Sequence, residues 1–81
     1  MIDCSHGNSL KDYKKQGDAW RYYINNYVDE DNMIGMMLES NLCEGNQNIK
    51  DLPLKYGVSI TDSCIGLLET EQLLRELHER L

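Results

Sequence analysis

The stretch Met33–Gln47, which reads MIGMMLESNLCEGNQ, decides how this chain is organised. Its first part, Met33–Leu38, is an unbroken apolar run of strand length. Such runs are typical of strands buried on both faces, as in parallel sheets covered by helices. Glu39 follows at once and opens a polar loop, so its carboxylate is expected at the carboxyl end of the strand, where α/β folds gather their active sites. Alternatively, Glu39 marks only the point where the strand leaves the core.

A helix is predicted between the amino terminus and this strand. Ser9, with Asp12 three residues later, forms an S-x-x-D capping box and predicts the helix start. Gly17 lies within the apolar face and predicts a close approach by another element, because glycine costs a helix ~1 kcal/mol relative to alanine. The aromatic residues of this segment are interpreted as helix-packing residues. The predicted buried face comprises Leu10, Tyr13, Gly17, Trp20, Ile24, Tyr27 and Val28.

The first half of the chain is expected to form a strand–helix–strand unit. Met1–Cys4 is the first short strand, Asp29–Asn32 is the polar turn after the helix, and Met33–Leu38 is the second strand. Parallel strands joined in this way have a right-handed crossover. The next segment, Ser40–Ile60, shows neither helical nor alternating periodicity, and a loop of that length is usually functional or disordered.

The carboxyl-terminal segment Thr70–Leu81 is predicted to be an amphipathic helix. Glu71–Arg75 and Glu76–Arg80 are favourable pairs at i,i+4 spacing. His78 is interpreted as a surface residue. The predicted packing stripe comprises Leu73, Leu74, Leu77 and Leu81.

Composition restricts the class of protein. With 81 residues the chain is at most one small domain, residues 1–81, and its 27% charged and 41% hydrophobic residues are ordinary for a globular protein. The net charge of −6 argues against nucleic acid or an anionic membrane surface as a partner. No apolar run approaches the ~20 residues of a membrane span, and no signal peptide opens the chain. A soluble, cytoplasmic protein is therefore expected.

The three cysteines, Cys4, Cys43 and Cys64, are odd in number and widely spaced. This pattern suits neither a secreted disulfide framework nor a C-x-x-C zinc site. We expect reduced, packed thiols, because free cysteine is among the most buried residue types. Cys4 and His6 would share a face on a strand, so a Cys/His metal pair stays open as an alternative.

Three polar residues occupy equivalent places in the predicted fold. His6, Glu39 and Asp62 each follow a candidate buried segment and open a loop or a helix start. One imidazole and two carboxylates form a donor set suited to divalent Mn, Fe, Zn or Co. Spacing alone does not decide whether the three residues form a metal site or are unrelated polar residues, since the fold must bring them together.

Three ordered blocks of this sequence resemble the class I DAHP synthases, the 3-deoxy-7-phosphoheptulonate synthases of the shikimate pathway of aromatic amino acid biosynthesis. The blocks are Asp3–Ser9, then Leu38–Ser40 with Glu44–Gln47, and Tyr56–Gly66. The resemblance covers essentially the whole chain. It implies an α/β fold that is the carboxyl-terminal part of a (β/α)8 TIM barrel: strand seven, helix seven, strand eight, a long loop and helix eight.

The resemblance also implies a site and a reaction. His6, Glu39 and Asp62 would ligate a divalent metal ion (Mn, Fe, Zn or Co), and Asp62 would also face the substrate. The implied reaction is the condensation of phosphoenolpyruvate with erythrose 4-phosphate, releasing phosphate. The metal would act as a Lewis acid on the aldehyde oxygen.

The chain also departs from the family pattern. Leu67 stands where relatives usually have tryptophan, and the family's fourth metal ligand, a cysteine, comes from an earlier strand, as do the phosphate-binding Lys and Arg residues. Two parallel strands would also leave open sheet edges. We therefore expect a fragment whose partner is the remainder of the barrel or another copy, and which is inactive alone. A non-catalytic, barrel-completing module and a remnant without function are the alternatives.

Overall fold

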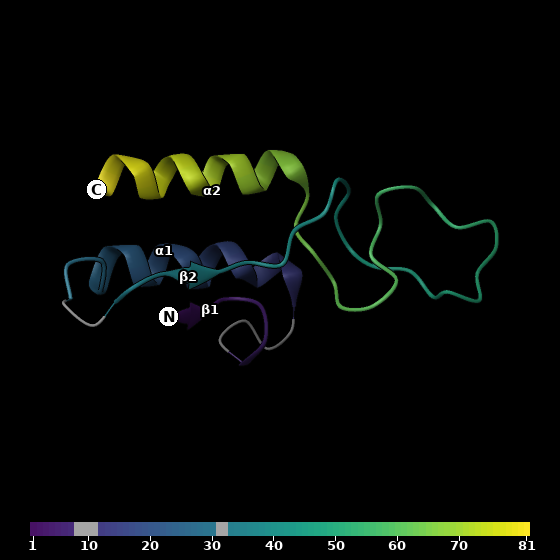
Figure 1. The fold of residues 1–81 in the computed structure, drawn as a ribbon, viewed down its shortest axis with the longest axis horizontal. Helices are drawn as coiled ribbons and strands as arrows, with labels where there is room; N and C mark the ends of the chain where they lie inside the picture. The colour runs from purple at the N-terminus through teal and green to yellow at the C-terminus, as the bar shows by residue number, and fades with distance from the viewer. Residues whose placement is uncertain (8–11, 31–32) are drawn as a thin grey trace.

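The computed structural model describes residues 1–7, 12–30 and 33–81. The two strands pair in parallel, with Ile2 opposite Met36 and Asp3 opposite Met37. Both strands run toward the long loop and both helices run back from it (Figure 1), as in α/β proteins. In chain order the elements are β1 (Ile2–Asp3), the 3-10 helix η2 (Tyr13–Lys15), α1 (Gln16–Asn26), β2 (Met36–Met37) and α2 (Leu67–Arg80).

The second strand is shorter and less buried than the sequence predicts. Within the predicted strand Met33–Leu38, only Met36–Met37 forms a ladder, and Ile34 is 85% exposed. Met36 and Leu38 pack against the core. Burial of the strand on both faces is therefore wrong for this chain, because the sheet of the described residues has two strands and leaves both Met36 and Met37 only half-buried.

The main helix begins later than predicted. Ser9 lies outside the described residues, but the backbone of Asp12 is extended, with φ −97° and ψ 113°, so a helix running from Ser9 through Asp12 is wrong. The Asp12 carboxylate accepts a hydrogen bond from the Lys14 backbone N–H at 2.9 Å and caps η2 instead. Aspartate favours such local bonds to its own backbone, and they compete with a continuous helix. The α-helix therefore starts only at Gln16.

The buried face of α1 packs on α2. Trp20 and Ile24 are buried as predicted, and the Trp20 indole N–H donates to the Leu73 carbonyl oxygen at 2.9 Å. A Cβ atom on Gly17 would lie 3.1 Å from Glu69 Oε2, which confirms the predicted close approach by another element. The core comprises Cys4, Ala19, Trp20, Ile24, Ile65 and Leu73.

Helix α2 starts at Leu67, earlier than the predicted Thr70. Of its predicted packing stripe, Leu73 is fully buried and Leu77 packs against the core. Leu74 and Leu81 are exposed, so this half of the stripe is wrong. The reason is that, in the described chain, α1 lies along one side of α2 (Figure 1), so only the leucines on that side are covered.

Charged side chains also join the two helices. The predicted pair Glu71–Arg75 forms, with Arg75 Nη2 2.9 Å from Glu71 Oε1. The predicted pair Glu76–Arg80 is wrong, because Glu76 accepts from Arg21 Nε on α1 at 3.2 Å. Arg80 also contacts α1, where its Nη1 atom donates to Asn25 Oδ1 at 2.7 Å. Contacts between the helices thus replace a contact within one helix.

The segment Ser40–Ile60 is irregular, as predicted, and projects beyond the helices (Figure 1). Its shape is held by the Gln47 side chain, which donates to the carbonyl oxygens of Lys55 and Val58 at 2.8 and 2.9 Å. Gly57 has φ 79°, and a Cβ atom there would lie 2.9 Å from the Cβ atom of Leu42. Backbone hydrogen bonds also hold the loop, because the Gln47 backbone N–H donates to the Ser59 carbonyl oxygen at 2.8 Å and isolated bridges join its two sides.

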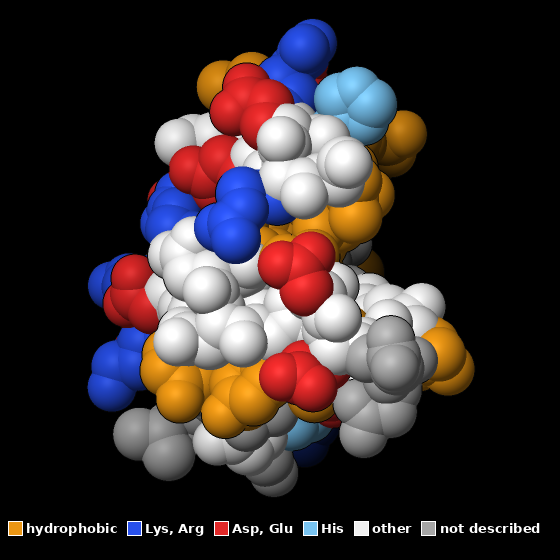
Figure 2. All heavy atoms as spheres, turned by 90° about the vertical axis from the view of Figure 1, so that its left-hand side faces the viewer, with side chains coloured by type: hydrophobic (Ala, Val, Ile, Leu, Met, Phe, Trp, Pro, Cys, Tyr) orange, Lys and Arg blue, Asp and Glu red, His pale blue; other side chains and the backbone are white. Residues whose placement is uncertain are grey.

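The end of the molecule opposite the loop carries mixed charges with apolar side chains exposed between them (Figure 2). Along the described part of the chain, neither helix combines the length and apolar character needed to cross a bilayer. A cytoplasmic location stays a prediction.

Candidate metal centre

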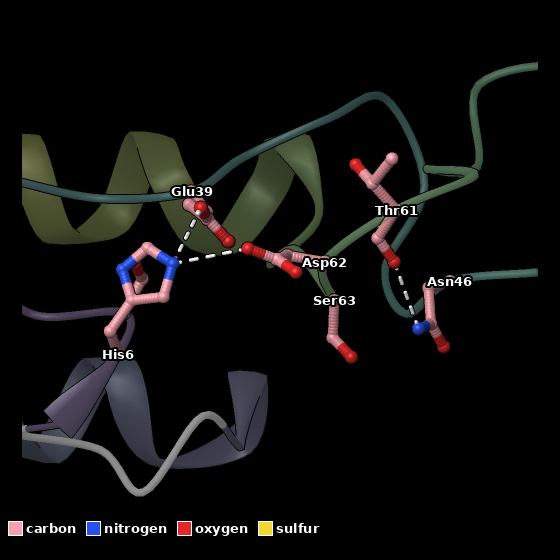
Figure 3. A pocket seen from close by; sticks show the side chains of 7 residues that line it. His6, Glu39, Asn46, Thr61, Asp62 and Ser63 are labelled. Atoms are coloured by element: carbon pink, nitrogen blue, oxygen red, sulfur yellow. Dashed lines mark hydrogen bonds and ion pairs between the residues drawn. The ribbon is translucent and has the colours of Figure 1, made fainter.

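The fold brings His6, Glu39 and Asp62 together. His6 follows β1, Glu39 follows β2, and Asp62 lies between the long loop and α2. The His6 Nε2 atom is 3.1 Å from Asp62 Oδ2 and 3.4 Å from Glu39 Oε1. The three side chains point toward one another (Figure 3), and one donor atom from each lies within 4.8 Å of the others. The parallel strands explain this meeting, because their carboxyl ends share one edge.

Asp62 reaches this edge because the chain around it is tied to β2. The backbone N–H of Ile65 donates to the Glu39 carbonyl oxygen at 2.9 Å, and Ile65 itself is fully buried. The Asn46 side chain donates to the Thr61 carbonyl oxygen at 3.1 Å. Asp62 is therefore held from both sides although a long irregular loop separates it from Glu39.

Asp3 orients the imidazole of His6. Asp3 Oδ2 lies 2.8 Å from His6 Nδ1, while Asp3 Oδ1 accepts from the Ser5 backbone N–H at 2.8 Å and from the Ser5 hydroxyl at 2.9 Å. Because a carboxylate is an acceptor, this contact assigns the proton to Nδ1. Nε2 is then the nitrogen that faces Glu39 and Asp62.

The charges of the cluster shift its titration. The pKa of His6 is raised, mainly by its hydrogen bonds to Asp3 and Asp62, with a further contribution from the Glu39 charge. The pKa of Asp3 is lowered to about 2 by the Ser5 backbone N–H and by the hydrogen bond to His6. Nε2 thus faces acidic oxygens that attract a cation, and a metal ion can take the place of the proton there.

The distances from His6 Nε2 to its two carboxylate neighbours fit a divalent cation. Two ligands that each lie about 2.1 Å from one ion, at an angle of about 90–110°, are about 3.0–3.4 Å apart. The separations of Nε2 from the two carboxylate oxygens, 3.1 and 3.4 Å, fall in this range. Imidazole and carboxylate ligands suit Mn, Fe, Zn and Co.

The cluster opens into a polar pocket of about 200 Å³. The side chain of Glu39 is 24% exposed and that of His6 38%, whereas that of Asp62 is 65% exposed and lies nearest to solvent. Sequence reasoning missed Asp3 as the partner of His6, although an acid three residues before a histidine near a strand end was a readable signal. It also missed three lining residues whose meeting depends on the loop. These are Asn46, Thr61 and Ser63.

The cysteines lie outside this donor cluster. Cys4 is fully buried in the core, and it is not a member of the three-residue group of potential metal ligands that the described residues form, which comprises His6, Glu39 and Asp62. Cys64 is also buried, but Cys43 is exposed, so the expectation of a packed thiol is wrong for Cys43. Burial, with a contribution from the Asp3 charge, raises the pKa of Cys4 to about 11.

This difference predicts selective alkylation of the native chain by iodoacetamide. Cys43 should react first, whereas Cys4 should react only after denaturation, because it is buried and its thiolate form is rare at neutral pH. Peptide mass spectrometry would measure the labelled fraction of each cysteine. Equal labelling rates for Cys4 and Cys43 in the native chain would contradict the structure.

The Asp3→Asn variant is expected to weaken Mn²⁺ binding by ~10–100-fold, the typical cost of losing the outer partner of a ligating histidine. Asparagine keeps the shape of the side chain but removes the charge that holds the Nδ1 proton. Equilibrium dialysis gives the affinity, and ¹⁵N chemical shifts of the His6 ring give the tautomer. Asp18→Asn, on the exposed side of α1, is the matched control. Unchanged affinity and ring shifts in Asp3→Asn would contradict this role.

A parallel strand–helix–strand unit with an imidazole and two carboxylates at its strand ends defines an α/β protein with a candidate metal centre. The family profile described as "DAHP synthetase I family" matches residues 1–75. The chain belongs to this family.

Curated relatives match this chain over its whole length. It is 50% identical, over 84 aligned residues, to a Tyr-sensitive phospho-2-dehydro-3-deoxyheptonate aldolase of Enterobacter agglomerans, of which it covers 39%. It is 46% identical to the Tyr-sensitive enzyme of that name from Escherichia coli K12, of which it covers 24%. The chain therefore spans well under half the length of these relatives.

A solved structure has the same fold. The phospho-2-dehydro-3-deoxyheptonate aldolase of Francisella tularensis SCHU S4 superimposes with a TM-score of 0.93 at 45% sequence identity. The match covers 99% of this chain and 24% of that chain. The arrangement of strands, helices and loop is thus one that a much longer protein contains.

Proposed function

We propose that this chain is the carboxyl-terminal part of the barrel of a DAHP synthase. In this proposal β1 and β2 are strands seven and eight, and α1 and α2 are helices seven and eight. The order of the elements and the parallel pairing support it, as does the superposition on part of the Francisella protein. The convergence of three donors from distant segments is the observation that carries the functional proposal.

His6, Glu39 and Asp62 would hold a divalent cation, which supplies Lewis-acid polarisation of a carbonyl oxygen when bound. Asp3 keeps the His6 Nδ1 proton, so that Nε2 offers its lone pair. Glu39 is the most buried of the three side chains and gives a fixed carboxylate. Asp62 is the most exposed and faces the open pocket, which suits the additional contact with substrate.

The proposed reaction is the condensation of phosphoenolpyruvate with erythrose 4-phosphate. Carbon three of phosphoenolpyruvate attacks the aldehyde carbon, water adds at carbon two, and inorganic phosphate leaves. The hydroxyl and amide groups of Thr61, Ser63 and Asn46 beside the donors provide polar contacts for an oxygen-rich substrate. The groups that bind the substrate phosphates would come from the remainder of the barrel.

The remainder of the barrel, or another copy, is the proposed protein partner. Large apolar side chains are exposed, including Ile34 at 85% and Leu68 at 83%. Apolar surface of this kind marks contact regions where it forms patches. This observation also favours the second candidate, a module that completes a barrel without taking part in catalysis.

A split-enzyme experiment tests the proposal and separates the two candidates. The chain is co-expressed with the Escherichia coli relative truncated before the region that matches it. We expect consumption of phosphoenolpyruvate that depends on erythrose 4-phosphate only when both pieces are present, and loss of this activity with His6→Ala. Activity that survives His6→Ala would support a non-catalytic module, and activity of the chain alone would contradict the need for a partner.

A further inference from the structure

Gln16 is a polar residue with no exposed surface, at the first position of α1. Its amide oxygen accepts a hydrogen bond from the Glu39 backbone N–H at 2.9 Å, and its amide nitrogen donates to the Glu39 carbonyl oxygen at 3.0 Å. One side chain thus pairs with both backbone polar groups of a single residue. That residue carries the most buried carboxylate of the candidate metal centre.

The second partner of the Glu39 backbone comes from the segment between the long loop and α2. Its carbonyl oxygen also accepts the Ile65 backbone N–H at 2.9 Å, so both lone pairs of this oxygen are used. Glu39 is therefore fixed between α1 and the segment that carries Asp62. Because β1 ends at Asp3 and β2 ends at Met37, Gln16 supplies at Glu39 the pairing that a neighbouring strand would otherwise give.

An apolar residue could fill the volume of Gln16, and a buried amide is unfavourable unless it is fully paired. The amide of Gln16 is explained by its two hydrogen bonds to the Glu39 backbone. Fixing the backbone of Glu39 fixes the direction in which its side chain leaves the chain, and so the distance of its carboxylate from His6 Nε2. Ligands held in this way bind a metal without a further ordering step.

We propose that Gln16 is a positioning residue of the metal centre. It sets the Glu39 carboxylate against His6 and Asp62 so that the three donors are arranged before the cation binds. The proposal rests on the proposed function of these donors as a metal centre. Gln16 would not contact the cation itself; it acts through the backbone of Glu39.

Gln16→Met tests this role, since methionine matches the length of glutamine but cannot pair with Glu39. We expect the Mn²⁺ affinity of the chain, measured by titration calorimetry, to fall by at least ~10-fold. In the metal-free chain, hydrogen exchange of the Glu39 amide should become faster, while the amides of α2 keep their protection. Gln72→Met, an exposed glutamine on α2, is the matched control and should change neither quantity.

Two results would overturn the proposal. One is unchanged Mn²⁺ affinity in Gln16→Met. The other is an affinity loss that follows a loss of protection throughout α2, because that pattern indicates general destabilisation. Failure of the underlying metal function looks different: the parent chain would bind Mn²⁺ no better than His6→Ala, although Glu39 exchange still responds to Gln16→Met. That result would contradict the proposed metal binding itself, and with it the role of Gln16 in metal binding.

Discussion

The His6→Ala chain should bind Mn²⁺ or Zn²⁺ more than ~100-fold more weakly than the parent, beyond the ~10–100-fold cost of losing an outer partner of a metal ligand. His6 is the only nitrogen donor in the cluster, and its Nε2 atom lies 3.1 and 3.4 Å from the two carboxylates. Alanine leaves two acidic groups with no imidazole between them. Equilibrium dialysis at fixed pH measures the loss.

His78→Ala is the matched control for this experiment. His78 is exposed on α2, far along the chain from the cluster, and its replacement should leave the affinity unchanged. The parent affinity should also fall as the pH is lowered, because the raised pKa of His6 lets a proton compete for Nε2. Equal affinities of the His6→Ala and parent chains would contradict the metal centre, and so would equal losses in the two histidine variants.

Leu73→Ala is expected to reduce the free energy of unfolding by about 2–5 kcal/mol, the usual cost of deleting a fully buried leucine side chain. Leu73 has no exposed surface, belongs to the core, and lies where α2 meets Trp20 and Gly17. Small domains have a total stability of only about 5–15 kcal/mol, so this loss would remove a large share of that stability and lower the urea midpoint. Urea denaturation followed by fluorescence of Trp20, the one tryptophan of the chain, measures it.

The neighbouring residue offers a close control for Leu73. Leu74 is 53% exposed, and Leu74→Ala should change the free energy of unfolding by no more than ~0.5 kcal/mol. Both variants remove the same atoms from adjacent positions of one helix. A loss in Leu74→Ala as large as that in Leu73→Ala would mean that α2 packs on another face than the one described.

Helical periodicity predicted the existence of both helices but not their boundaries. Trp20 and Ile24 were correctly predicted to be buried, because their spacing defines one face of a helix. The start of α1 was wrong because Asp12 uses its side chain to bond its own backbone. The predicted burial of Leu74 and Leu81 was wrong, because periodicity gives the apolar face of a helix but not the width of the surface that covers that face.

Sequence spacing also predicts hydrogen bonds and ion pairs only within one element, not between elements. Local pairing rules predicted Glu71–Arg75, which forms, and Glu76–Arg80, which is replaced by the contact of Glu76 with Arg21. Gln16 gave no signal in the sequence, since a glutamine at a helix start is ordinarily exposed. Its partner, Glu39, lies on another element.

The sequence by itself determined the strand–helix–strand order, the two helices and the choice of His6, Glu39 and Asp62 as candidates. These depend on local periodicity and on residue type, which are properties of short stretches. Only the tertiary structure decided that the three donors meet, that Asp3 and Gln16 hold two of them, and which leucines are buried. These depend on distances between segments that are far apart along the chain, and parallel pairing of β1 with β2, together with the Ile65 contact to Glu39, sets those distances.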